Sequence, residues 1–255
     1  MLKIFSLCVI LLGLPELQGC DPTPVKVEFM FHHVDVNSWP AVEANLQQRN
    51  IRPDEVTDLI FYKCDLTQVP DWVGEKMPNL TDLDIGGNKV KKLPATIERL
   101  TKLTNIKAND NKITEIPSFL SKLPELRFVN FSGNKLKNIS KSSLNLPKLR
   151  FLDLADNQIS TLPDLSGLKN LSGLRLEHNE GIGFVTQSTT LDYLDFLDLS
   201  HCNLKTVPSF LGTFPRLINF NLSGNPLLEE GSGDKWGKKE LKQRFGDKVR
   251  FREDP

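Results

Sequence analysis

The feature that most constrains the fold of this chain is a fifteen-residue frame, L-x-x-L-x-L-x-x-N-x-L-x-x-L-P, which recurs eight times between residues 56 and 228. Successive copies begin 22 to 24 residues apart, at Val56, Leu80, Leu103, Leu126, Leu149, Leu171, Leu194 and Leu217. A constant period of this length predicts an array of structural repeats, because each unit buries its apolar edge against its neighbours. We therefore expect an elongated molecule rather than one with a single central core.

Within each frame the first, fourth and sixth positions are apolar, as in Leu149, Leu152 and Leu154. Apolar and polar positions alternate around the fourth residue, and this alternation predicts a short strand with one buried and one outward face. The ninth position, where the chain leaves the strand, is restricted to asparagine and cysteine. Its occupants are Cys64, Asn88, Asn111, Asn134, Asn157, Asn179, Cys202 and Asn225.

This frame resembles the leucine-rich repeat (LRR) in its 23-residue form. The resemblance implies an α/β fold, namely a right-handed solenoid of about eight repeats that forms a horseshoe arc with a concave parallel β-sheet. It also implies that the ninth-position side chains stack in a buried ladder, where they satisfy backbone groups that would otherwise be unpaired. On this basis residues 56–228 are the repeats, and residues 229–255 form a C-terminal cap.

The N-terminal flank predicts a second cap. Residues 25–31 alternate like an edge strand, and Asn37 or Ser38 can begin a helix that places Val42 and Leu46 on one face. We expect this cap, together with the residues that precede it, to occupy positions 20–55.

The first residues of the chain predict export. Lys3 precedes an apolar run from Ile4 to Leu14, which is too short to span a bilayer but suits the core of a signal peptide over residues 1–19. The following Leu17-Gln18-Gly19-Cys20 resembles the lipobox of bacterial lipoproteins. That resemblance implies cleavage before Cys20, acyl chains on Cys20, and an exported, membrane-anchored bacterial LRR lipoprotein. The alternative is an ordinary secretory signal and a soluble secreted LRR recognition or host-directed effector protein without an anchor.

The two cysteines inside the repeats are predicted to be free. Cys64 and Cys202 occupy the same frame position six repeats apart. At about 4.8 Å per stacked strand they lie about 29 Å apart, whereas a disulfide requires Cα atoms within about 7 Å. The sequence therefore predicts two buried thiols.

The charge pattern favours a protein partner. The chain carries 32 basic and 32 acidic residues, and this balance argues against a nucleic-acid binder. On the predicted concave face, nine acidic side chains stand against five basic ones, which favours a partner with some basic character. Aromatic and arginine side chains are typical interface anchors. The candidate contacts are Phe128, Asn130, Phe151, Asp153, Arg175, Phe196 and Asp198.

No catalytic constellation accompanies these residues, because the frame predicts neither an enclosed pocket nor an oxyanion hole. We therefore expect a non-enzymatic module without cofactor, metal or small-molecule substrate. One pair leaves a question open. His178 and His201 occupy the eighth position of adjacent repeats, where they are solvated side chains, part of a surface metal site or a pH-sensitive patch.

Overall fold

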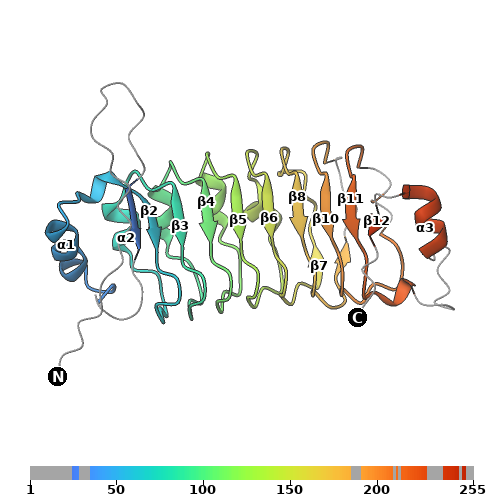
Figure 1. The fold of residues 1–255 in the computed structure, drawn as a ribbon, viewed down its shortest axis with the longest axis horizontal. Helices are drawn as coiled ribbons and strands as arrows, with labels where there is room; N and C mark the ends of the chain where they lie inside the picture. Colours follow the sequence, from blue (N-terminus) through green and yellow to red (C-terminus); the bar gives the residue numbers. More distant parts are fainter. Residues whose placement is uncertain are drawn as a thin grey trace.

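The computed structural model describes residues 25–28, 35–184, 191–208, 211, 214–228, 238–246 and 249–250. Ten strands form one parallel sheet along the long axis of the molecule (Figure 1). In spatial order they are β1 (Val25–Glu28), β2 (Val56–Ile60), β3 (Asp82–Asp84), β4 (Asn105–Lys107), β5 (Phe128–Asn130), β6 (Phe151–Asp153), β8 (Gly173–Arg175), β10 (Phe196–Asp198), β11 (Asn219–Asn221) and β12 (Val249–Arg250). This is the solenoid that the recurring frame predicts.

The register of the sheet follows the frame. Leu152 of β6 pairs with Val129 of β5 on one side and with Leu174 of β8 on the other, so fourth positions meet fourth positions. The fourth residue of each of these strands is buried, while most third and fifth residues remain partly exposed. We call the outward surface of the sheet, formed by the second, third, fifth, seventh and eighth frame positions, the concave face.

The opposite, convex side carries short helical turns in the first repeats. They comprise α2 (Trp72–Lys76) and the 3-10 turns η2 (Ala95–Arg99), η3 (Ser118–Lys122) and η4 (Lys141–Leu144). Of two shorter 3-10 turns, η1 (Pro53–Glu55) directly precedes β2 and η6 (Pro226–Leu228) lies in the last frame. Apart from η1, each buries at least one residue in the core, such as Ile97 of η2 and Leu120 of η3. Pro94 and Pro117 are the N-cap residues directly before η2 and η3, where a proline needs no backbone N–H.

The fifth and sixth repeats differ, because their convex side is extended. β7 (Thr161–Leu162) pairs in parallel with β9 (Gly183–Phe184). The sixth frame lacks the usual proline, and Gly181 stands at its eleventh position, which is apolar in the other frames. Ile182 is only 4% exposed and takes the place of the missing apolar side chain. A shift of one residue therefore restores core packing.

Helices lie at both ends of the array (Figure 1). Ser38 is the N-cap of α1 (Trp39–Gln48), which buries Val42 and Leu46 as their spacing predicts. At the other end, α3 (Lys238–Phe245) buries Leu241 completely. The ring of Phe245 packs edge-on against Phe220 of β11, with the ring centroids 5.0 Å apart. Both helices shield apolar repeat edges that would otherwise face solvent.

The predicted signal segment and the candidate lipidation site Cys20 lie outside the described residues. Among the described helices, none combines the length and the apolar character that crossing a bilayer requires.

Candidate functional site

The ninth-position side chains tie each repeat to the one before it. Asn134 shows the pattern: its Oδ1 accepts from the backbone N–H of Ile113 at 2.9 Å, and its Nδ2 donates to the carbonyl of Ala108 at 2.9 Å. The same Nδ2 also donates to two carbonyls of its own turn. Equivalent bonds recur at Asn88, Asn111, Asn157, Asn179 and Asn225. This ladder fixes the positions of the strands, and hence the spacing of the side chains on the concave face.

The two cysteines of the ladder are free but not alike. Cys202 is fully buried, and its Sγ donates to the carbonyl of Leu176 at 3.2 Å. Cys64 is only half-buried, contrary to the expectation of two buried thiols. Cys64 belongs to the first frame, where the neighbouring unit is the N-terminal cap rather than another repeat.

This difference predicts unequal thiol reactivity. Burial raises the pKa of the Cys202 thiol to about 12, and the thiolate is the species that attacks a disulfide reagent. At pH 8 we expect Cys202 in the folded protein to react at least about 100-fold more slowly than Cys64, as followed by mass spectrometry of the labelled peptides. In denaturant the two rates should converge. Equal rates in the folded protein would contradict the burial of Cys202.

A row of aromatic side chains occupies the third frame position on the concave face. Phe128 and Phe151 are half-buried, and their rings stack with centroids 5.5 Å apart and planes 6° from parallel. Phe151 leans over Gly173, since a Cβ atom at Gly173 would lie 2.4 Å from the Phe151 ring. Phe196, also half-buried, follows in the next strand. We call Phe128, Phe151 and Phe196 the aromatic row.

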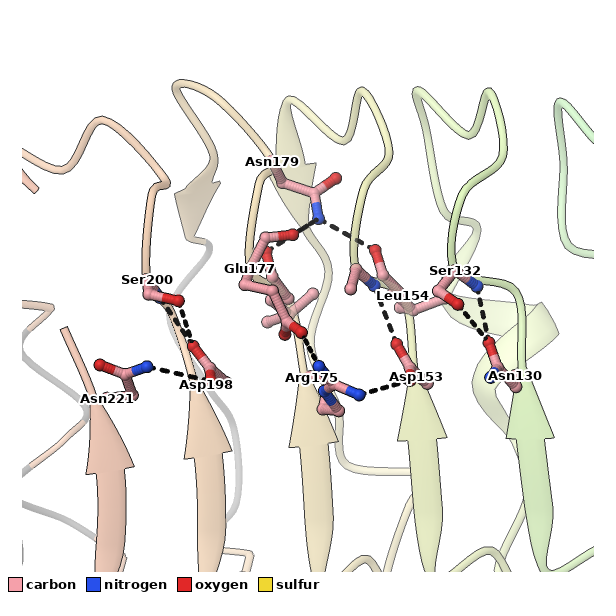
Figure 2. A network of polar contacts seen from close by, with 12 residues as sticks. Asn130, Ser132, Asp153, Leu154, Arg175, Glu177, Asn179, Asp198, Ser200 and Asn221 are labelled. Atoms are coloured by element: carbon pink, nitrogen blue, oxygen red, sulfur yellow. Dashed lines mark hydrogen bonds and ion pairs between the residues drawn. The ribbon is translucent and has the colours of Figure 1, made fainter. Parts of the chain in front are cut away.

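The fifth frame position beside this row holds polar side chains with internal partners (Figure 2). Asn130 Oδ1 accepts from the backbone N–H of Ser132 at 2.8 Å, and Asp198 Oδ1 accepts from that of Ser200 at 2.9 Å. This Asx-type bond closes the turn after the strand. Asn130 and Asp198 remain half-buried, so they contribute to the concave face while they also shape its turns.

Arg175 lies at the centre of an ionic cluster (Figure 2). Its guanidinium pairs with Asp153, with Nη1 and Oδ2 3.4 Å apart, and also bonds to Glu177. Burial lowers the pKa of Arg175, but the two carboxylates outweigh this effect and the net shift is upward. The Arg175 side chain is still 43% exposed. The cluster therefore presents a guanidinium of fixed orientation next to the aromatic row.

Asp153 and Glu177 are less exposed than the sequence suggested. Their side chains are 5% and 9% exposed. The Arg175 side chain pairs with both, with Asp153 in the neighbouring strand and with Glu177 two residues later in its own repeat. Burial raises the pKa of both carboxyl groups, and the nearby Asp198 charge adds to the shift at each. The Asp153 carboxylate thus pairs with Arg175 and is itself almost inaccessible to solvent.

This burial predicts a pH dependence. Because the pKa of Glu177 is raised in the folded state, its contribution to stability is present below its ordinary value of 4.5 and is lost as pH rises through the folded pKa. We expect the wild type to gain stability relative to Glu177→Gln as pH falls from 7 to about 4.5, measured by urea unfolding. The exposed Glu180→Gln serves as the control. If the stability difference between wild type and Glu177→Gln does not change with pH, or shrinks on acidification, the burial of the Glu177 carboxyl group is contradicted.

The residues at the eighth frame position share a backbone conformation that the strand pattern does not predict. All eight occupants have positive φ, and they are Lys63, Gly87, Asp110, Gly133, Asp156, His178, His201 and Gly224. Glycine at three and aspartate at two of these positions was the available signal, because both residue types tolerate this region better than most.

His178 and His201, both at the eighth position, share this positive φ and have parallel side chains. The rings of His178 and His201 stack face to face, with centroids 4.6 Å apart and planes 1° from parallel. Lone pairs of ring nitrogens lie in the ring plane, so stacked parallel rings do not converge on one ion. Within the described part of the chain, no group of three or more His, Cys, Asp or Glu side chains is arranged to hold a metal.

Comparisons with known proteins agree with this architecture. Residues 147–192 match a family model described as leucine-rich repeats in two copies, and residues 193–214 match a model of a single leucine-rich repeat. Over 69 residues the chain is 45% identical to Tsukushi of Xenopus tropicalis, a stretch that spans 26% of this chain and 19% of Tsukushi.

Solved structures with a similar fold include a leucine-rich repeat protein. An LRR protein of Leptospira interrogans superposes with a TM-score of 0.68 at 25% identity, over 78% of this chain and 49% of that protein. A chain of the LRIM1/APL1C complex superposes with a TM-score of 0.56 at 24% identity, over 67% of this chain and 31% of the other. The predicted leucine-rich repeat fold is confirmed. The chain spans half or less of the length of these relatives.

Proposed function

We propose that this protein is a non-enzymatic binding module that recognises a protein partner through its concave face. The observation that carries the proposal is the aromatic row beside Arg175. Phe128 and Phe151 form a rigid, half-exposed stack, and the guanidinium next to it is held by two carboxylates. Preformed aromatic and arginine anchors reduce the entropy cost of binding and are typical of interface hot spots.

The comparisons support a binding role of this kind. LRR proteins generally serve as protein-interaction modules, and one structural neighbour is itself a complex of two proteins. For this chain, Phe128, Asn130, Phe151, Arg175, Phe196 and Asp198 supply the contact surface, and Asp153 holds Arg175 in place.

The first test is capture of the partner by the full-length protein. Wild type, Phe151→Ala and Phe119→Ala are used as baits, since Phe119 is a half-buried aromatic residue of the convex turn η3. A partner that binds wild type and Phe119→Ala but not Phe151→Ala supports the concave face. A partner retained equally by all three would argue against it.

We further propose that the module is anchored in a bacterial envelope through acyl chains on Cys20. The lipobox-like Leu17-Gln18-Gly19-Cys20 supports this, and two or three acyl chains are enough for stable anchoring. Mass spectrometry of the mature N-terminus tests it. An acylated Cys20 is the expected result, whereas an unmodified N-terminal residue other than Cys20 would establish the alternative, a secreted recognition protein without an anchor.

A further inference from the structure

Lysine side chains gather in the turns that follow strands β3, β4 and β5. The tenth frame position is lysine in these three consecutive repeats, at Lys89, Lys112 and Lys135, and further lysines follow Lys89 and Lys135 after two or three residues. All of them are exposed. We call this set the lysine strip, and its members are Lys89, Lys91, Lys92, Lys112, Lys135 and Lys137.

The backbone holds the lysine strip in register. The N–H of Lys112 donates to the carbonyl of Val90 at 2.9 Å, and the N–H of Lys135 donates to that of Ile113 at 2.9 Å. Each tenth-position lysine is therefore one repeat from the next, a step of about 4.8 Å. This step is shorter than the Debye length of about 8 Å at physiological salt, so the fields of neighbouring ammonium groups add.

Nearby carboxylates offset only part of this charge. Lys89 pairs with Asp65 at 2.8 Å, and the exposed Asp110 and Glu115 lie within three residues of Lys112. Lys112 and Lys135 form no ion pair with any other described residue. Six lysines thus stand against three carboxylates in one edge of the array.

The strip is confined to these three repeats. The tenth position holds Gln158, Glu180 and Asn203 in the next three. A positive region of limited length on a chain with no net charge is a local feature, distinct from the mildly acidic concave face.

We propose that the lysine strip binds an extended anionic polysaccharide that carries sulfate or carboxylate groups. Lysine acts as a point charge and suits anions spaced along a flexible chain. The strip contains no aromatic side chain on which a nucleic-acid base could stack, and its apolar neighbours Val90, Ile113 and Leu136 are buried, so it offers no apolar group for insertion into a membrane. This surface is independent of the aromatic row and of the proposed protein partner.

Heparin is the probe for the test, applied to the full-length protein in calorimetry over a range of salt concentrations. We expect binding that weakens steeply with salt, because counterions are released on association. The double variant Lys112→Gln/Lys135→Gln should bind about tenfold more weakly, with a shallower salt dependence. The control is Lys169→Gln/Lys205→Gln, which removes two exposed lysines elsewhere in the array and should bind as the wild type does.

Two results would overturn the proposal. The first is the absence of heparin binding at low salt, or an equal loss in the test and control variants. The second is a stronger, Lys112- and Lys135-dependent preference for duplex DNA, or for phosphatidylserine-containing vesicles over vesicles of phosphatidylcholine alone. Circular dichroism of both variants verifies that they are folded.

Discussion

Replacing Asn134 by alanine should lower the free energy of unfolding by about 3 kcal/mol. The substitution leaves the buried N–H of Ile113 unpaired, and the carbonyl of Ala108 keeps only its bond from Asn111 Nδ2 at 3.3 Å. Asn134 itself is only 7% exposed, so water does not readily replace its amide. An unsatisfied buried backbone group costs about 1–3 kcal/mol, and the weakened bonding of the Ala108 carbonyl places the expected loss at the upper end of that range. Equilibrium unfolding in urea measures the effect.

Asn130→Ala is the matched control. Asn130 is half-buried, and its Oδ1 accepts from the Ser132 backbone N–H and hydroxyl within its own turn. Water can take over those bonds, and the expected cost is about 1 kcal/mol or less. A larger loss of unfolding free energy for Asn130→Ala than for Asn134→Ala would contradict the assignment of Asn134 to the buried ladder and of Asn130 to the outward face.

Gly74→Ala should be destabilising by about 3 kcal/mol. Gly74 lies in α2, where a Cβ atom would be 2.1 Å from the carbonyl oxygen of Thr96 and 2.3 Å from its carbon. Those atoms belong to the backbone of the next convex turn, so relief requires α2 and η2 to move apart. Thermal or urea unfolding of the variant gives the cost.

Gly183→Ala is the control for this steric argument. A Cβ atom at Gly183 would meet its nearest neighbour, the Ser160 carbonyl oxygen, at 3.4 Å, an ordinary contact. The expected change is within about 0.5 kcal/mol. Similar losses at Gly74 and Gly183 would mean that the close packing of the convex turns does not account for the effect.

The sequence predicted which strand residues face the core and which face outward, because successive side chains of a strand alternate between its two faces. Once Leu152 is buried, Phe151 and Asp153 must point to the other face. The ladder was implied by the resemblance to the leucine-rich repeat, and in the structure the ninth-position side chains do bond to backbone groups of the preceding repeat.

The features that the sequence did not predict depend on contacts between repeats. Asp153 is buried because Arg175, 22 residues later, folds against it, and no local pattern encodes that contact. Cys64 is half-buried because its neighbour is a cap. The pairing of β7 with β9 arises where the sixth frame loses its proline, and two-residue strands have no period to detect.

The most direct test of the account is the affinity of the captured partner for three forms of the protein, measured by calorimetry. We expect Phe128→Ala/Phe151→Ala to weaken binding by at least about 30-fold, which corresponds to about 2 kcal/mol for a pair of hot-spot residues. The convex variant Phe119→Ala should match the wild type, and circular dichroism should show all three folded. An unchanged affinity in the double variant, with the fold intact, would contradict recognition through the concave face.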